Sequence, residues 1–225
     1  LVRVLSEMRA ACAGREIAAI SFGSQLDGLV PCAADGTALR PALIWCDRRA
    51  GEECAAADIE PPRLRELTGC NLDPGHVAPK IAWVARNEPD AHAAAAVFAL
   101  PGSWVAWQAS GELAVDPSNA SSASLLDPRA RAWSEEACEA FGVDMARLPP
   151  VRAAHAVLGP IRDWLRDATG LDGSTLVVMG AGDEMAATLG AGVVEPGVVC
   201  DVMGTAEPVC AVVAEPAFDP TGVVE

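Results

Sequence analysis

Toward its C-terminus the chain reads Thr175-Leu176-Val177-Val178-Met179-Gly180-Ala181-Gly182-Asp183, and small residues continue through the stretch 184–189. The run 175–179 predicts a strand, and the stretch 184–189 predicts a helix. The glycines between them would let the backbone and a ligand approach closely. Ligands of α/β folds bind at the carboxyl ends of strands, so Asp183 is the first candidate for a functional acid. A helix-capping aspartate is the simpler alternative, and the local sequence does not decide between the two.

Predicted strands and helices alternate along the chain. The predicted strands are 17–22, 28–33, 42–45, 97–100, 175–179, 198–202 and 208–213, and the predicted helices are 2–13, 48–57, 61–67, 79–86, 103–109, 134–141, 161–169 and 184–189. This alternation predicts the α/β class. A helical stretch gives way to a new strand near Gly173, so we expect one domain over residues 1–173 and the start of another over 174–225.

Composition excludes several classes of protein. The formal net charge is −15, and a surface this acidic repels the phosphate backbone of a nucleic acid. It does not exclude a nucleotide, which backbone N–H groups and Mg²⁺ can hold. No apolar run reaches the roughly 18 residues of a membrane span. The chain also starts without a signal-peptide layout and without a Met, so we expect it to begin inside a longer protein that binds neither nucleic acid nor membrane.

The cysteines and histidines give little support to a metal site. The eight cysteines include no C-x-x-C pair, and His76, His92 and His155 are far apart in the sequence. Most of the cysteines lie in apolar segments and are expected to be small core residues. A reducing cytoplasm is therefore the predicted location.

Other polar breaks could carry chemistry. In Gln25-Leu26-Asp27-Gly28, between two predicted strands, Asp27 could accept hydrogen bonds from sugar hydroxyls, although a solvated turn fits equally well. In Trp45-Cys46-Asp47-Arg48-Arg49 a charge pair could order a loop, or lie on the surface with little effect. Gly204-Thr205 could present N–H groups to a phosphate, although an ordinary hairpin turn is the simpler interpretation.

These segments occur in the order found in FGGY carbohydrate kinases, and the chain resembles that family over nearly its whole length. The resemblance rests on Leu39-Arg40-Pro41-Ala42-Leu43-Ile44-Trp45-Cys46-Asp47-Arg48-Arg49, on Pro74-Gly75-His76-Val77-Ala78-Pro79-Lys80-Ile81-Ala82-Trp83-Val84, on Gly111-Glu112 with Asp116-Pro117-Ser118-Asn119-Ala120-Ser121, on Trp133-Ser134, on Leu148-Pro149-Pro150, on Gly180-Ala181-Gly182-Asp183 and on Gly204-Thr205. Several ordered motifs at family spacing are far more specific than one short pattern.

The resemblance implies ribonuclease-H-like domains of the actin and hexokinase superfamily, with a sugar in the cleft between two domains and ATP on the second. Asp183 matches the base that takes the proton of the attacking sugar hydroxyl. Leu26, Asp27 and Glu184, together with Asp183, would contact the sugar. Gly204 and Thr205 would contact the ATP phosphates. Mg²⁺ would accompany ATP, and no residue is assigned as its ligand.

The sequence also departs from the family pattern at the substrate positions. Asp27 stands where xylulose-type members have His, and Glu184 stands where they tend to have Asn. His76 replaces a commoner Phe, whereas Gly75 stands where glycerol-type members have Tyr and would leave room for a longer sugar. The resemblance therefore implies ATP-dependent phosphorylation of a ketose such as xylulose. A polyol kinase and a non-catalytic sugar-binding fragment are the alternatives.

Parts of the family pattern are not in this sequence. The D-x-G-T phosphate loop of the first strands does not occur, nor does the adenine-binding half of the second domain. We therefore expect a first domain that lacks its first strands and a second domain that is truncated. We also expect these 225 residues alone to be inactive as a kinase, and we leave a homodimer open.

Overall fold

The strand predicted before Asp183 lies at the centre of a small sheet. In the computed structural model, which describes residues 1–12, 14–203, 207–219 and 221–223, this strand is β8 (Leu176–Val178). It pairs in parallel with β1 (Ala19–Ile20) and antiparallel with β7 (Val157–Pro160). Just beyond, β9 (Ala181–Gly182) pairs in parallel with β2 (Gly23–Ser24). Segments about 160 residues apart thus run side by side up to Asp183.

The break between β8 and β9 requires glycine at position 180. Gly180 has φ of 90°, a left-handed conformation that side chains rarely adopt. A Cβ there would lie 2.2 Å from the carbonyl oxygen of Phe22. The backbones of the paired segments therefore approach closely at the point where the chain turns toward Asp183.

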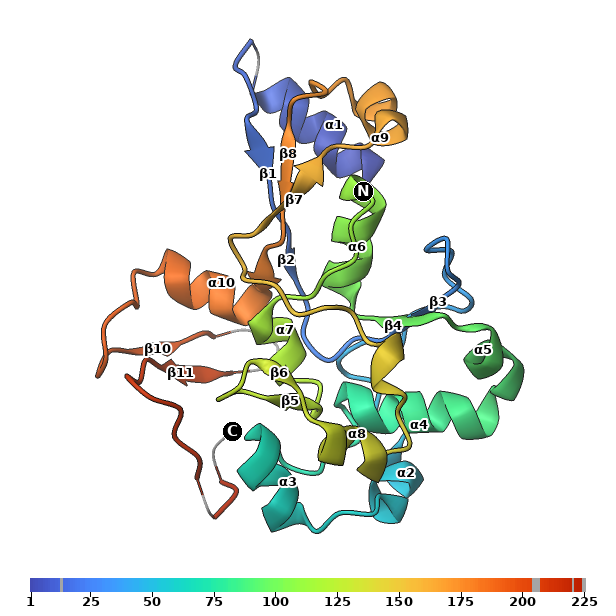
Figure 1. The fold of residues 1–225 in the computed structure, drawn as a ribbon. Coiled ribbons are helices and arrows are strands. Elements are labelled where there is room, and N and C mark those ends of the chain that lie inside the picture. The colour runs from blue at the N-terminus through green and yellow to red at the C-terminus, as the bar shows by residue number, and fades with distance from the viewer. Residues whose placement is uncertain (13, 204–206, 220, 224–225) are drawn as a thin grey trace.

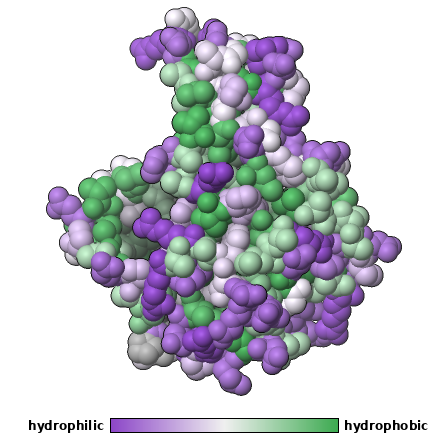
Figure 2. Space-filling model, in the orientation of Figure 1, coloured by the Kyte–Doolittle hydropathy of each residue, from purple (hydrophilic) through white to green (hydrophobic). Residues whose placement is uncertain are grey.

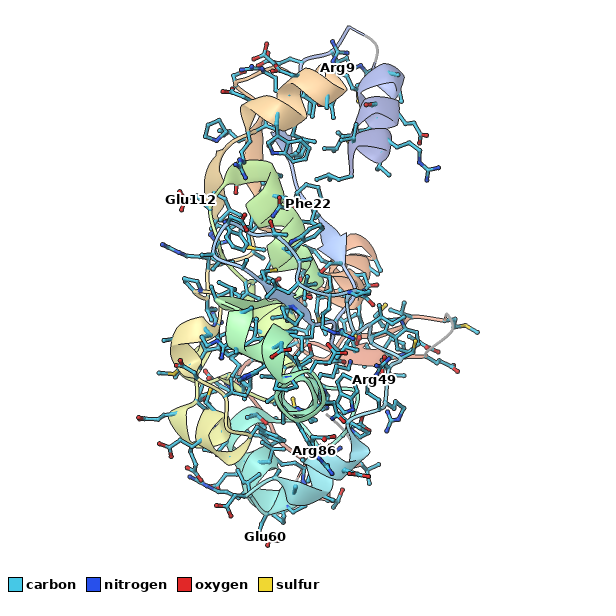
Figure 3. All side chains as sticks on the ribbon, turned by 90° about the vertical axis from the view of Figure 1, so that its right-hand side faces the viewer. Arg9, Phe22, Arg49, Glu60, Arg86 and Glu112 are labelled. Atoms are coloured by element: carbon cyan, nitrogen blue, oxygen red, sulfur yellow. The ribbon has the colours of Figure 1, made fainter. Side chains whose placement is uncertain are left out.

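Helices pack around the upper end of this sheet and form a narrow lobe (Figure 1). They are α1 (Val2–Ala11), α6 (Pro101–Ser110) and α9 (Asp163–Thr169). Leu5, Leu165 and Val177 are buried between helices and sheet. Figure 3 shows this lobe from the side, with Arg9 at its top and Phe22 where it meets the rest of the molecule.

The broad lower part holds the largest hydrophobic core. Its centre includes Leu29, Phe98 and Leu125, each fully buried. The surrounding elements are β3 (Val30–Cys32) paired with β4 (Val97–Ala99), β5 (Leu126–Asp127) paired with β6 (Ala132–Trp133), α2 (Gly51–Ala56), α3 (Pro61–Thr68), α4 (Val77–Asn87), α5 (Pro89–Ala94), α7 (Pro117–Ser121), α8 (Glu135–Ala140) and a 3₁₀ turn at Met145–Arg147.

A third group of elements projects from the side of the molecule (Figure 1). It consists of α10 (Asp183–Gly190) and the antiparallel pair β10 (Val199–Asp201) and β11 (Val209–Ala211). In the space-filling view the surface is hollowed between this side and the lower body (Figure 2). Asp183 is the first residue of α10.

The α/β class is confirmed, but the strand predicted over 42–45 is wrong. Leu43 makes a single antiparallel bridge to Leu29. The carbonyl of Ile44 then accepts a hydrogen bond from the ammonium of Lys80, and the N–H of Trp45 donates to the Gln25 side chain. Side chains thus take the backbone groups that a neighbouring strand would have used.

The domain boundary predicted near Gly173 does not coincide with a break in the sheet, because β8, which follows Gly173, pairs with β1 from the start of the chain. No helix in the described residues is both long enough and apolar enough to cross a membrane.

Candidate active site

A cavity of about 500 Å³ opens between α10, β10–β11 and the turn after β2. Its lining includes the four residues predicted to contact a sugar, which are Leu26, Asp27, Asp183 and Glu184. The other residues that line it are Gln25, Trp45, Ala187, Val202 and Pro208. Residues far apart in the sequence thus meet around one concave space, which is the usual form of a small-molecule site.

Asp183 presents an exposed carboxylate at one end of this cavity. Gly182 is the N-cap of α10 and Asp183 is the first helical residue, so the capping alternative does not describe it. The Asp183 carboxylate accepts a hydrogen bond from the N–H of Glu184 at 3.0 Å. A general base must lie within reach of the substrate hydroxyl, and Asp183 lies on the lining of the cavity.

A buried network holds the backbone just before Asp183. Asp116 caps α7 by accepting hydrogen bonds from the N–H groups of Ser118 at 2.9 Å and Asn119 at 3.1 Å. The Ser118 hydroxyl donates to Asp116 and accepts from the N–H of Gly182 at 2.8 Å. The side-chain oxygen of Asn119 accepts from the hydroxyl of Ser24, on the strand that pairs with β9. Sequence analysis included Asp116, Ser118 and Asn119 in a motif but assigned them no role.

Leu26 supplies an apolar part of the lining and packs against the turn that carries Asp183. A Cβ at Gly182 would lie 2.4 Å from Leu26 Cδ2, so no side chain fits at position 182 without displacing Leu26.

Asp27 is contacted by residues from the start of α4. His76 Nδ1 lies 3.0 Å from Asp27 Oδ1, and Lys80 Nζ donates to the Asp27 carbonyl at 2.6 Å. Neither contact could be predicted from the sequence, because His76 and Lys80 are 49 and 53 positions away from Asp27.

Trp45 and Gln25 also line the cavity. Gln25 Oε1 accepts from the N–H of Trp45 at 3.3 Å, and the Trp45 side chain is 43% exposed. Next to it, Asp47 forms the predicted loop charge pair, with Arg49 Nη2 2.7 Å from Asp47 Oδ2. The hydrogen bond from Arg49 lowers the pKa of the Asp47 carboxyl. Sequence analysis did not assign Trp45 to the substrate site, although an exposed tryptophan at a cavity is a common surface for stacking on a sugar.

Gly75 is not part of the lining. It is buried, and a Cβ on it would lie 2.9 Å from Asp73 Oδ1, which accepts the Gly75 N–H at 2.7 Å. Arg48 forms an ion pair with the same carboxylate at 2.6 Å. The tight turn at Asp73 is a local reason for glycine at position 75, and the expectation that Gly75 makes room for a longer sugar stays a prediction.

Glu184 is held from the side by β11. The Cys210 thiol lies 2.9 Å from Glu184 Oε1 and is the donor in this hydrogen bond. Burial raises the pKa of the Cys210 thiol, and the hydrogen bond to Glu184 raises it further. Cys210 therefore stays protonated, leaving the other Glu184 oxygen to a ligand.

Gly204 and Thr205, predicted to contact ATP phosphates, lie outside the described residues. Among the residues that are described, no group of three His, Cys, Asp or Glu side chains is arranged to hold a metal ion.

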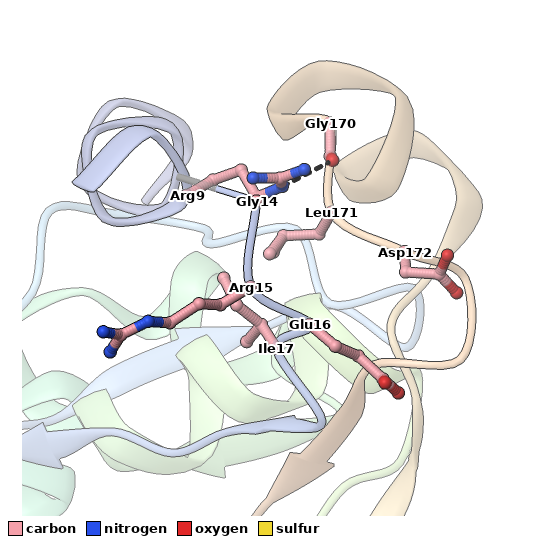
Figure 4. A pocket seen from close by; sticks show the side chains of 8 residues that line it. All are labelled: Arg9, Gly14, Arg15, Glu16, Ile17, Gly170, Leu171 and Asp172. Atoms are coloured by element: carbon pink, nitrogen blue, oxygen red, sulfur yellow. Dashed lines mark hydrogen bonds between the residues drawn. The ribbon is translucent and has the colours of Figure 1, made fainter. Parts of the chain in front are cut away.

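A second cavity, of about 410 Å³, lies at the far end of the upper lobe (Figure 4). It is formed by the turns that follow α1 and α9, where Arg9 Nε donates to the Gly170 carbonyl at 3.3 Å. None of the predicted site residues lines it. It is an open groove between two helix ends rather than part of the site.

The chain is similar in sequence and in fold to known carbohydrate kinases. The N-terminal domain model of the FGGY family of carbohydrate kinases matches residues 2–190. The xylulose kinase of Escherichia coli K12 is 29% identical over 191 residues, which are 85% of this chain and 39% of that protein. The xylulose kinase of Streptomyces coelicolor is 35% identical over 217 residues, which are 94% of this chain and 44% of that protein.

A solved structure shows the same fold. The ligand-bound xylulose kinase from Lactobacillus acidophilus superimposes with a TM-score of 0.91 at 21% identity, covering 98% of this chain and 45% of that one. The chain thus spans less than half the length of each of these relatives.

Proposed function

Because the chain belongs to the FGGY family of carbohydrate kinases, we propose that the complete gene product transfers the γ-phosphoryl group of ATP to a hydroxyl of an uncharged sugar, a ketose such as xylulose. The observation that carries this proposal is the cavity that joins Asp183 to Leu26, Asp27 and Glu184. The similarity to xylulose kinases supports the ketose.

Asp183 acts in this proposal as the general base. The sugar hydroxyl gives its proton to the Asp183 carboxylate as its oxygen forms a bond to the γ-phosphorus, and the bond from that phosphorus to the bridging oxygen breaks to release ADP. The hydrogen bond that the Gly182 N–H donates to the Ser118 hydroxyl supports this role, because a base must be held in line with its substrate.

The charges of the lining favour an uncharged substrate. Asp27, Asp183 and Glu184 all face the same cavity, so a sugar acid would meet carboxylates of its own sign. Neutral hydroxyls, in contrast, can donate hydrogen bonds to these carboxylates, which accept only.

ATP is the phosphate donor of carbohydrate kinases, and Mg²⁺ is proposed to arrive with it. No step is assigned to the ion, because the described residues offer no cluster that would hold it. The eight cysteines form no disulfide within the described residues, in keeping with the reducing cytoplasm proposed as the location. We assign no interface for a homodimer.

The proposal is tested by coupled measurement of ADP release from the complete gene product with ATP and Mg²⁺. The panel is xylulose, glycerol and gluconate, with a sugar-free reaction as the blank. We expect kcat/KM to be highest for xylulose and lowest for gluconate. A preference for glycerol would identify a polyol kinase, which the carboxylate of Asp27 would suit. Sugar binding by calorimetry without ADP release above the blank would reject catalysis.

A further inference from the structure

Asp27 has an unusual backbone conformation for a residue that faces a ligand cavity. Its φ is 57°, in the left-handed region where a non-glycine residue is uncommon. Its side chain is 23% exposed and lines the cavity. A residue in such a conformation persists only where its surroundings hold it, so the contacts of Asp27 are informative.

The first of these contacts fixes the carboxylate. His76 is the N-cap of α4, its side chain is 9% exposed, and its Nδ1 lies 3.0 Å from Asp27 Oδ1. An ionised carboxylate only accepts hydrogen bonds, so Nδ1 carries the proton in this pair. One carboxylate oxygen of Asp27 is thereby engaged, and Oδ2 is left to accept from a ligand.

The second contact fixes the backbone. Lys80 lies one helical turn after His76, and its side chain is fully buried. Its ammonium donates to the carbonyls of Asp27 at 2.6 Å, Ile44 at 2.9 Å and Gly75. These carbonyls belong to the turn that carries Asp27, the segment leading to Trp45 and the turn before α4. One buried cation thus joins the segments that bring Asp27 and Trp45 to the cavity.

Among the residues that the structure describes, carbonyl dipoles hold Lys80, with no ion pair at contact distance. Burial lowers the pKa of its ammonium, whereas the charges of Asp27 and Asp47 raise it. Full hydrogen bonding of the ammonium is what makes such burial tolerable.

We propose that His76 and Lys80 are positioning residues that hold Asp27 for recognition of a sugar hydroxyl, and that the His76–Asp27 pair is a specificity determinant of the site. This inference rests on the proposed function, since it takes the occupant of the cavity to be a neutral sugar. Asp27 accepts a hydrogen bond from a sugar hydroxyl through its free oxygen, His76 sets the direction of that oxygen, and Lys80 sets the position of the backbone.

The test is a double-mutant cycle on the complete gene product with xylulose as the probe. His76→Phe keeps a ring but removes the donor, and we expect KM and the calorimetric Kd to rise about 10-fold with kcat changed less than about threefold.

His76→Asn places an amide donor near the position of Nδ1, so it should recover most of the affinity for xylulose. Asp27→Gly removes the carboxylate and accepts the positive φ. When Asp27→Gly is already present, adding His76→Phe should change the Kd for xylulose by less than about twofold.

Controls separate this inference from a general loss of stability. His92→Phe changes a histidine that stacks on Phe98 outside the site and should leave KM unaltered. Lys80→Met should weaken xylulose binding as well, and if that variant does not fold, the cycle on His76 and Asp27 still decides the proposal.

Two outcomes would overturn the positioning role. One is an unchanged Kd for xylulose in His76→Phe, and the other is an equal change of Kd by His76→Phe in the wild type and in Asp27→Gly. The proposed function is contradicted by a different result, namely a wild-type protein that releases no ADP. In that case the double-mutant cycle still tests the positioning role, because calorimetry measures binding of xylulose and not catalysis. A wild-type protein that does not bind xylulose at all would reject both.

Discussion

Asp183 differs from Asp116 in how few groups hold its carboxylate. Its one described hydrogen bond comes from the neighbouring N–H of Glu184, whereas Asp116 accepts several and is almost fully buried. A carboxylate that is satisfied by its own protein has no capacity left for a substrate proton. Asp183 has that capacity, and Asp116 instead supports the backbone that carries it.

We expect Asp183→Asn in the complete gene product to lower kcat by at least 10²–10⁴-fold while the calorimetric Kd for xylulose changes little, because an amide cannot take the hydroxyl proton. Asp90→Asn is the matched control, since Asp90 also lies in the first turn of a helix and is exposed. Turnover at the wild-type rate in Asp183→Asn would show that another group is the base.

Asp27 could be predicted from the sequence as a site residue, but the contacts that hold it could not. Its place in a polar break between strands was enough to make it a candidate, and the structure brings it to the cavity with Asp183. Its contacts with His76 and Lys80 could not be predicted, because they depend on how α4 packs beneath the turn. Glu184 was likewise a candidate, whereas its partner Cys210 lies 26 positions away on β11.

At the scale of elements, α7 links the Asp116 motif to the turn before Asp183. Its five residues are too few to form a stable helix alone. The Asp116 cap and the hydrogen bond from Gly182 to Ser118 tie it to its neighbours. The helix therefore supports the backbone of β9, and its Ala120 is also buried in the main hydrophobic core.

Ser118→Ala should therefore lower kcat about 3- to 10-fold, because it removes the acceptor of the Gly182 N–H and loosens the base, at a stability cost of roughly 1 kcal/mol. Ser121→Ala on the same helix removes a hydroxyl that bonds only its own helix backbone, at Ser118, and should leave kcat unchanged. Melting temperature and kcat are measured for both. Equal loss of kcat in the two variants would mean that α7 has no specific link to the site.

Most elements could be predicted because local patterns determine them. The helix over α3 ends at Gly69 with φ of 80°, and α8 begins at the Ser134 cap, both as the sequence indicated. The prediction failed where side chains replace strand partners, as after Leu43, and where short elements depend on tertiary contacts, as in α7 and β9. Capping and periodicity are local, whereas such contacts are not.

At the scale of the whole molecule, the chain matches an N-terminal family domain and spans less than half of its relatives. The family match runs to residue 190, through the boundary predicted near Gly173, and β8 hydrogen-bonds with β1 across it. We therefore propose that the first domain extends to the end of α10. Both Asp183 and Glu184 then belong to the first domain, with Asp27.

We expect residues 1–225 expressed alone to release no ADP from ATP and Mg²⁺ above the blank, with or without xylulose. Phosphoryl transfer depends on positioning the phosphates as well as the sugar, and the described part of the chain supplies groups mainly for the sugar. Coupled ADP release measures this directly, with the complete gene product as the positive control. Sugar-dependent turnover by the 225 residues alone would contradict the expectation.

Lys80 is the only lysine in these 225 residues, and its ammonium is fully buried. The rate at which Lys80 is acylated therefore reports how often the structure around this side chain opens. An amine-acylating reagent should modify the N-terminal amine at once, and Lys80 only when the start of α4 comes apart. Mass spectrometry of the two sites follows both rates in one sample. Xylulose should slow acylation of Lys80 if it binds the closed cavity, and equal rates at the two amines would show that this lysine is not enclosed.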